Sequence, residues 1–300
     1  MIKSLTGFLF LLCCSIYAQQ DITKQELKQH IEYLTSDDLK GRYPGTPEND
    51  SIVDYLVDNF KSNGIQTLIQ GFPAVMRKDS SSVTTWNVLG FLEGKNPLLR
   101  EEVVILGAHY DHLGTKGDHI YNGADDNASG TAALLEIAEK LKANEHLLQR
   151  SVIFIAFGAE EQGLLGSKFF VENPIVPLKN IVLMVNMDML GHLNEQKHVY
   201  MGGAGTFPGG VELMKNLGER LQLNPIVHAG SVGGSDHVSF YQKKISVLGL
   251  HTGGHDHYHQ PTDTIEKLYI PGIVQVSNYI YQTLIHVASS DKKMGFIKQE

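Results

Sequence analysis

The stretch "EEVVILGAHYDHLG", residues 101–114, contains the pattern that decides the fold. A short run of large apolar residues ends there in the polar segment His109-Tyr110-Asp111. A continuous apolar run of this length is typical of a strand buried on both faces of a parallel sheet. Three further runs have the same form: "SVIFIAF" at 151–157, "NIVLMVN" at 180–186 and "KISVLGL" at 244–250.

Helical patterns separate or flank these runs. Leu134, Ala138 and Leu141 share one helix face between the first two runs, and Leu213, Leu217 and Leu221 precede the last. Strands that alternate with helices predict an α/β fold, with a central, mostly parallel (mixed) sheet covered by helices on both faces. Further helices are expected at 23–35, with a capping box of Thr23 and Glu26, from Thr46-Pro47 to Gly64, and around Val276, Ile280, Leu284 and Val287.

Composition places the chain among folded globular proteins. Its 300 residues are 42% hydrophobic and 19% charged, which is enough apolar material for a sizeable core. The formal net charge is -8, and the sequence contains no clustered stripe of Lys and Arg. This balance argues against nucleic acid as a partner, because binding phosphates requires a basic surface.

The N-terminus, "MIKSLTGFLFLLCCSIYAQQ", has the order of a secretory signal peptide. Lys3 is followed by an apolar stretch and by a cleavage site after Ala18. A membrane anchor is the alternative, but the apolar run is shorter than the ~20 residues that span a bilayer. We therefore predict a signal peptide at 1–18, a single domain at 19–300, and export to the periplasm or the medium. Both cysteines lie in the first 18 residues, so the processed chain would have no disulfide.

Side chains that bind metals follow each predicted strand. His109 and Asp111 follow the first, Glu160-Glu161 the second, Asp188 the third, and the loop "HTGGHDHYHQPTDT" the last. A single His or Asp at a strand end is more often a turn residue, but charged groups next to buried strands are costly unless they are paired. Ligands bind outside the carboxyl ends of parallel strands, so we expect these groups to converge.

Imidazole nitrogens and carboxylate oxygens together suit Zn²⁺ and, less specifically, Mn²⁺ or Co²⁺. Several carboxylates can hold two cations if one of them bridges the pair, and such pairs assist hydrolysis. Asp111 lies two residues after His109 on extended chain, where it can orient the imidazole.

The chain resembles the M28 family of zinc metallopeptidases, whose best known members are secreted aminopeptidases with two zinc ions. The resemblance covers most of the chain, from "GRYPGT" near residue 41 to "YHQPTDT". The motifs that carry it occur in order: "GAHYDHLG", "NGADDNASG", "GAEEQGLLGS", "NMDMLG", "GGSDHVSF" and "HYHQPTDT".

The resemblance implies five metal ligands. His109 and Asp188 would bind one zinc, Glu161 and His259 the other, and Asp126 would bridge them.

It also implies three catalytic roles. Glu160 would be the general base, Asp111 would orient His109, and Tyr258 would help to stabilise the tetrahedral intermediate. The neighbouring glutamates would thus have different tasks.

The expected function is a zinc-dependent exopeptidase that removes N-terminal residues from peptides with a free N-terminus, by attack of a hydroxide that bridges the two metals. Three alternatives stay open: a carboxypeptidase or aminoacylase of another di-zinc family, a single-zinc glutaminyl cyclase, and a peptide-binding module without activity. The sequence does not predict an oligomeric state.

Several other polar residues are interpreted as non-ligands. His251, His255 and His257 are expected on the loop surface or pocket wall, and His112 is expected to be structural or to support a ligand. Asp125 is expected to support its loop. The segment Ser235-Asp236-His237 has the residue types of a catalytic triad, but adjacent residues rarely reach triad geometry, so we assign it to the pocket.

Overall fold

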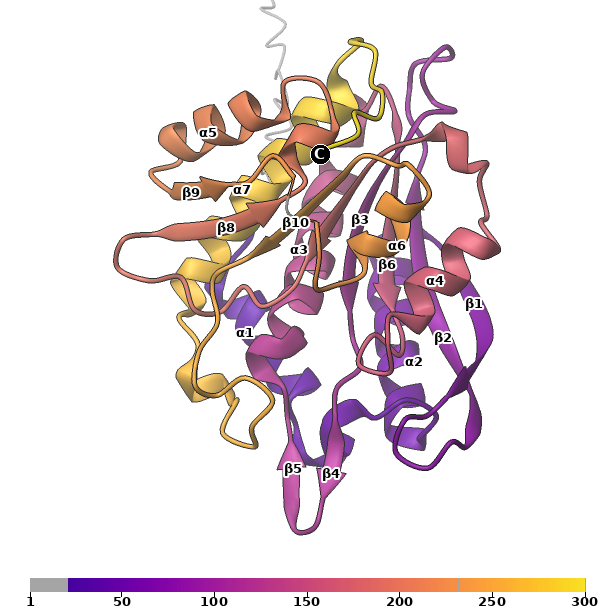
Figure 1. Ribbon diagram of the computed structural model, residues 1–300, viewed down its shortest axis with the longest axis vertical. Helices are drawn as coiled ribbons and strands as arrows, with labels where there is room; N and C mark the ends of the chain where they lie inside the picture. The colour runs from indigo at the N-terminus through magenta and orange to yellow at the C-terminus, as the bar shows by residue number, and fades with distance from the viewer. Residues whose placement is uncertain (1–20, 231, 300) are drawn as a thin grey trace, which may run out of the picture.

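A mixed sheet of eight strands forms the centre of the protein, in the order β1-β2-β6-β3-β7-β10-β8-β9 (Figure 1). The computed structural model describes residues 21–230 and 232–299, so the predicted signal peptide at 1–18 lies outside the described residues. The strands of this sheet are β1 (Gln66–Val75), β2 (Ser82–Leu92), β3 (Val103–His109), β6 (Ser151–Phe157), β7 (Ile181–Met187), β8 (His198–Gly202), β9 (Asn224–Val227) and β10 (Val247–His251). A separate hairpin of β4 (Gly114–Lys116) and β5 (His119–Tyr121) projects at the bottom of Figure 1.

The four predicted strands form the parallel centre of the sheet. They are β6, β3, β7 and β10, and each is parallel to its neighbour in this group. The strands β1, β2 and β8 run antiparallel to the neighbours that connect them to the centre. The prediction of a mostly parallel, mixed sheet is confirmed.

The outer strands were not predicted. β1 has mainly exposed or half-exposed side chains and contains Gly71 and Pro73. Proline and glycine are disfavoured in central strands, but an edge strand tolerates them because one side of its backbone has no partner. Such a strand has no continuous apolar run that identifies it in the sequence.

Helices cover both faces of the sheet, as predicted. Val104 and Leu106 of β3 point to one face and Val103 and Ile105 to the other, because side chains alternate along a strand. The first face is covered by α1 (Lys24–Leu34), α2 (Pro47–Ser62), α3 (Gly130–Ala143), α5 (Gly210–Arg220) and α7 (Ile270–Ser289), and the second by α4 (Leu165–Glu172) and α6 (His237–Gln242). Short helical turns lie at Asp37–Arg42, Ala124–Ser129, Glu145–Leu147, Leu178–Asn180, Ala204–Thr206 and Ile265–Lys267.

The predicted N-termini of the first two helices are present. Thr23 accepts a hydrogen bond from the Glu26 N–H at 3.1 Å, and Thr46 accepts one from the Asn49 N–H at 3.2 Å. These bonds satisfy N–H groups that the first helical turn leaves free.

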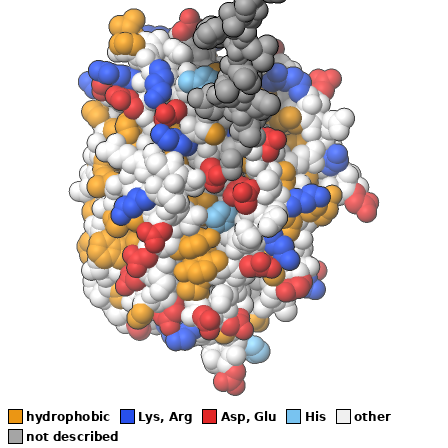
Figure 2. Space-filling model, turned by 180° about the vertical axis from the view of Figure 1, so that it is seen from behind, with side chains coloured by type: hydrophobic (Ala, Val, Ile, Leu, Met, Phe, Trp, Pro, Cys, Tyr) orange, Lys and Arg blue, Asp and Glu red, His pale blue; other side chains and the backbone are white. Residues whose placement is uncertain are grey.

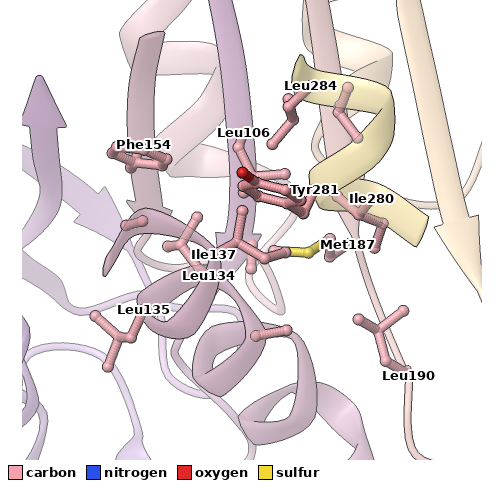
Figure 3. Close-up of a cluster of buried hydrophobic side chains, with 14 of the residues drawn as sticks. Leu106, Leu134, Leu135, Ile137, Phe154, Met187, Leu190, Ile280, Tyr281 and Leu284 are labelled. Carbon is pink, nitrogen blue, oxygen red and sulfur yellow. The ribbon is translucent and has the colours of Figure 1, made fainter. Parts of the chain in front are cut away.

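In the core, α3 and α7 pack side by side against β3 on one face of the sheet. Leu134 and Ile137 of α3 and Ile280 of α7 gather around Leu106 of β3, and all four side chains are fully buried (Figure 3). Full burial of an aliphatic side chain of this size contributes about 2 kcal/mol. This packing fixes the direction of β3 and therefore the position of His109 at its end.

The face opposite to the view of Figure 1 carries acidic and basic side chains interspersed with apolar ones (Figure 2). Among the described residues, we find no helix whose length and apolar character would suit a membrane crossing.

Candidate metal centre

The carboxyl ends of the four parallel strands bring the predicted residues to one edge of the sheet. His109 is the last residue of β3, and Asp188 follows directly after β7. Glu160 and Glu161 lie on the turn after β6, and His259 lies on the long loop after β10. The strands are neighbours in the sheet, so residues that are up to 150 positions apart in the sequence meet.

One group of potential ligands surrounds the end of β3. The Nε2 atom of His109 lies 3.3 Å from Asp126 Oδ1 and 3.3 Å from Asp188 Oδ1. Burial acts to lower the pKa of His109, but Asp188 and Glu160 outweigh it and hold that pKa well above its ordinary value. This cluster has one imidazole and two carboxylates, a donor set that suits a zinc ion.

A second group shares the same aspartate. The Nε2 atom of His259 lies 3.0 Å from Asp126 Oδ2 and 3.3 Å from Glu161 Oε2. Asp126 therefore directs one carboxylate oxygen to each group, which is the arrangement of a bridging ligand. Although burial opposes it, contacts with His109 and His259 hold the pKa of Asp126 well below its usual range.

His112 contacts this second group, and the sequence analysis expected it to be structural or to support a ligand. It is fully buried, and its Nδ1 atom lies 2.8 Å from Glu161 Oε1 and 3.9 Å from Asp126 Oδ2. Neither His112 Nδ1 nor Glu161 Oε1 has a partner with hydrogen-bond geometry among the described residues. This contact places His112 directly behind the Glu161 carboxylate, where it supports that proposed ligand. The sequence signal was the second histidine in "HYDH", directly after a predicted strand.

The loop before α3 positions Asp126 through its backbone. The N–H groups of Asp125 and Asp126 donate to the buried carboxylate of Asp263 at 2.9–3.1 Å. Gly123 has φ +55°, and a Cβ there would come within 2.5 Å of the His112 ring. The peptide bond between Asp126 and Asn127 is cis.

Arg42 holds the same loop from the other side, and the sequence analysis missed it. Its guanidinium is fully buried and donates to the carbonyls of Asn122 and Gly123 at 2.5 and 3.0 Å. It also donates to the carbonyl of Tyr110 at 2.8 Å, next to the end of β3. One cation thus connects the two segments that carry His109 and Asp126.

Asp111 contacts both His109 and the turn of the two glutamates. Its backbone carbonyl lies 3.2 Å from His109 Nδ1, while its carboxylate Oδ1 is 3.9 Å away from that atom. The carboxylate instead accepts hydrogen bonds from the N–H groups of Glu160 at 2.9 Å and Glu161 at 3.3 Å. Burial raises the pKa of Asp111 to about 6, against the opposing effect of His109.

The neighbouring glutamates have pKa values shifted in opposite directions. Burial raises the pKa of Glu160 well above its ordinary value, and Asp236 and Asp188 add to this shift. Burial also acts to raise the pKa of Glu161, but contacts with His112 and His259 outweigh it and lower that pKa overall. Groups whose surroundings separate their pKa values in this way are suited to different chemical tasks.

A cavity of about 530 Å³ opens beside the metal-binding edge. Its lining includes Glu160, Tyr200, His251, Tyr258 and His259. Tyr258 is 47% exposed, and its ring stacks on that of His259 with centroids 3.9 Å apart. Tyr258 is therefore part of the wall of the cavity.

Ser235, Asp236 and His237 do not form a triad. The Ser235 hydroxyl accepts a hydrogen bond from Asn186 at 2.9 Å, and the His237 ring lies so close to Gly249 that a Cβ there would come within 2.5 Å of its Cε1 atom. Burial raises the pKa of Asp236 to about 7 and lowers that of His237 to about 4. Ser235 and His237 line the cavity, as the sequence analysis expected for this segment.

The other histidines of the last loop have separate contacts. His251 stacks on Tyr200 with centroids 5.3 Å apart, and His257 Nδ1 lies 2.9 Å from the Thr262 hydroxyl. His255 Nε2 lies 3.0 Å from the carboxylate of Asp125.

Two clusters of imidazole and carboxylate groups around a shared aspartate, at the edge of a parallel sheet, have the composition and placement of a metal-binding site. This chain belongs to peptidase family M28, whose model matches residues 87–284.

The chain is similar to the aminopeptidase YwaD of Bacillus subtilis, with 28% identity over 81% of this chain and 54% of the relative. It thus spans about half the length of the curated relatives that it matches first.

Solved structures share its fold. A zinc aminopeptidase from Bacillus subtilis superposes with a TM-score of 0.76 at 17% identity, covering 91% of this chain and 97% of the other. A glutaminyl cyclase from Porphyromonas gingivalis superposes with a TM-score of 0.75 at 20% identity, covering 89% and 99%.

Proposed function

We propose that this protein is an exported zinc-dependent aminopeptidase that hydrolyses the first peptide bond of substrates with a free N-terminus. His109 and Asp188 would hold one zinc ion, Glu161 and His259 the other, and Asp126 would bridge them. When bound, the two ions would supply the acidic water that attacks the scissile carbonyl.

The convergence of these five side chains carries the proposal. They come from four strand ends and one helix-preceding loop, and the atoms that would face the ions lie 3.0–3.3 Å apart. So many buried carboxylates beside imidazoles are stable together only when positive charge compensates them. A pair of divalent cations supplies that charge.

Glu160 is the proposed general base. It lines the cavity, and its raised pKa makes it a better proton acceptor than an ordinary carboxylate. It takes the proton of the attacking water and delivers it to the leaving amine. Asp111 holds the Glu160 backbone in place through the N–H bond at 2.9 Å, so the carboxylate keeps its direction during this transfer.

Tyr258 is the proposed donor to the developing oxyanion. Its ring is fixed by stacking on His259, which would itself be anchored to zinc. The Tyr258 hydroxyl group would then donate a hydrogen bond to the tetrahedral intermediate.

The assay uses aminoacyl anilides with a free or an acetylated amine, each with and without chelator. We expect hydrolysis of the free substrates only, loss of activity with chelator, and recovery with zinc. Hydrolysis of the acetylated substrates would instead indicate an aminoacylase or another amide hydrolase.

A glutaminyl peptide separates aminopeptidase from cyclase. An aminopeptidase releases free glutamine, whereas a cyclase retains the residue as pyroglutamate and releases ammonia. The two products differ in mass, so one mass spectrum of the reaction decides. Pyroglutamyl product without free glutamine would overturn the proposal.

A further inference from the structure

Asp125, the neighbour of the proposed bridging ligand, has no role in the site described so far, but its side chain contacts other loops. Its side chain is fully buried. Its Oδ1 atom accepts hydrogen bonds from the Gly191 N–H at 2.5 Å and from the Ser129 hydroxyl at 3.2 Å. Its Oδ2 atom lies 3.0 Å from His255 Nε2. Asp125 is therefore a carboxylate with both oxygens in use.

These contacts join the segments that carry three of the proposed ligands. Gly191 follows Asp188 by three residues, and His255 precedes His259 by four. Asp125 itself precedes Asp126. The Asp125 carboxylate, which is not a proposed ligand, thus connects three loops. One carries Asp188, the second carries His259, and the third carries the bridging residue Asp126.

The loop with His259 is held on both sides of that residue. His255 contacts the side chain of Asp125, and Asp263 accepts hydrogen bonds from the N–H groups of Asp125 and Asp126. His255 and Asp263 each lie four residues from His259. His259 itself is only half-buried and has a left-handed backbone with φ +55°, which costs about 1 kcal/mol or more for a non-glycine residue. Its position therefore depends on these anchors.

The hydrogen bond between His255 and Asp125 has a defined direction. The His257 N–H donates to His255 Nδ1 at 3.2 Å, so Nδ1 is the acceptor nitrogen of the ring. Nε2 then carries the proton and donates it to Asp125 Oδ2. A side chain that replaces His255 must place an N–H at the position of Nε2 to keep this contact.

We propose that Asp125 and His255 are a positioning pair that fixes His259 and thereby sets the affinity of the zinc ion held by Glu161 and His259. This inference rests on the proposed ligands of the preceding subsection. Asp125 touches no ion in this account and acts through the loops that it joins.

A third cation held by Asp125, His192 and His255 is the competing explanation, because these three side chains also form a cluster. The His192 and His255 rings are stacked face to face, with centroids 3.8 Å apart and an interplanar angle of 17°. Imidazoles on one tetrahedral ion approach it from directions about 109° apart, which separates the rings. The stack and the His255 hydrogen bond favour the positioning pair.

The test counts zinc ions per chain by elemental analysis, after dialysis of the full-length protein against buffered zinc. The two substitutions that decide are His255→Gln, whose amide N–H reaches the position of Nε2, and His255→Asn, whose shorter side chain does not. His257→Ala is the matched control on the same loop, since His257 bonds to Thr262 and not to Asp125.

We expect two ions in the wild type, in His255→Gln and in His257→Ala. His255→Asn should bind the second ion at least tenfold more weakly while it keeps the first. The zinc-free forms of His255→Gln and His257→Ala should melt at the temperature of the wild type. Zinc-free His255→Asn should melt lower only by the amount that loss of one buried hydrogen bond accounts for, whereas a general loss of folding would affect both ions.

Three results would overturn the proposal. The first is wild-type affinity for both ions in His255→Asn. The second is loss of the second ion in His255→Gln at an unchanged zinc-free melting temperature, and the third is an additional ion in the wild type that His192→Ala removes. Ion counting needs no turnover, so a protein that binds two ions and hydrolyses no aminoacyl substrate would contradict the proposed function and leave this test intact.

Discussion

Two pairs of adjacent acids, Asp125-Asp126 and Glu160-Glu161, lie at the same edge of the sheet, and their members differ in surroundings. In each pair the second residue is a proposed zinc ligand and the first is not. Asp125 is fully buried, and both of its carboxylate oxygens accept hydrogen bonds. Glu160 lines the cavity, and in the described part of the chain no donor reaches its carboxylate.

The difference shows how equal charges at equivalent positions acquire separate tasks. Hydrogen bonds from three segments immobilise Asp125, so that it can connect loops but cannot exchange protons with a substrate. Burial raises the pKa of Glu160, and contact with the cavity gives it access to a reacting group. The surroundings of each acid, rather than its residue type, determine its role.

Removing the bridging member of the first pair should have the largest effect. Asp126→Ala deletes the carboxylate that both groups of ligands share, so we expect loss of both zinc ions and hydrolysis no faster than in chelator-treated wild type. Elemental analysis and an anilide assay measure the two quantities. Asp118→Ala, at an exposed acid of the β4–β5 hairpin, is the control, and normal zinc content in Asp126→Ala would refute the bridging role.

Glu160→Gln removes the charge of the proposed base and keeps its shape. We expect kcat to fall about 10³-fold, as for loss of a general base, with two zinc ions still bound. This variant separates the two pairs, because it affects turnover and not metal content. Full activity in Glu160→Gln would eliminate the mechanism.

Asp125→Asn should lower stability and leave turnover nearly unchanged, the opposite of Glu160→Gln. The amide keeps one oxygen but turns an N–H₂ group towards the donor on His255, so the free energy of unfolding should fall by about 2 kcal/mol. At saturating zinc, turnover per loaded chain should stay close to that of the wild type. Denaturant titration and kcat measure this, and a loss of kcat as large as that of Glu160→Gln would erase the distinction between the pairs.

Tyr258→Phe should have the smallest effect. Because Tyr258 is 47% exposed, loss of its hydroxyl group should lower kcat by about tenfold, less than the 10²–10³-fold that a buried oxyanion donor contributes, and leave KM unchanged. Steady-state kinetics test this. An unchanged kcat would remove Tyr258 from the mechanism.

The centre of the fold was predictable because each of its strands is buried on both faces. The apolar runs identified β3, β6, β7 and β10, and their order along the chain implied a parallel sheet. β1 and β2 pair with each other at one side, where exposed positions interrupt the apolar pattern. Their pairing depends on long-range contacts that no local pattern indicates.

The proposed ligands were predictable from their positions after strands and from the motifs of the family, but their supports were not. The partners of Asp125 lie 66 and 130 positions further along the chain, at Gly191 and His255. Asp111 had been expected to orient His109, and the structure adds its carboxylate contact to the glutamate turn. Such hydrogen bonds arise from loop geometry, which sequence spacing does not specify.

The most direct test of the account is a zinc titration of the chelator-treated protein, with hydrolysis of a free aminoacyl anilide and of its acetylated counterpart measured at each step. The account predicts that hydrolysis of the free substrate returns with zinc and is complete when two ions are bound per chain, while the acetylated substrate stays intact. No turnover of the free substrate with two ions bound, or equal turnover of both substrates, would contradict it.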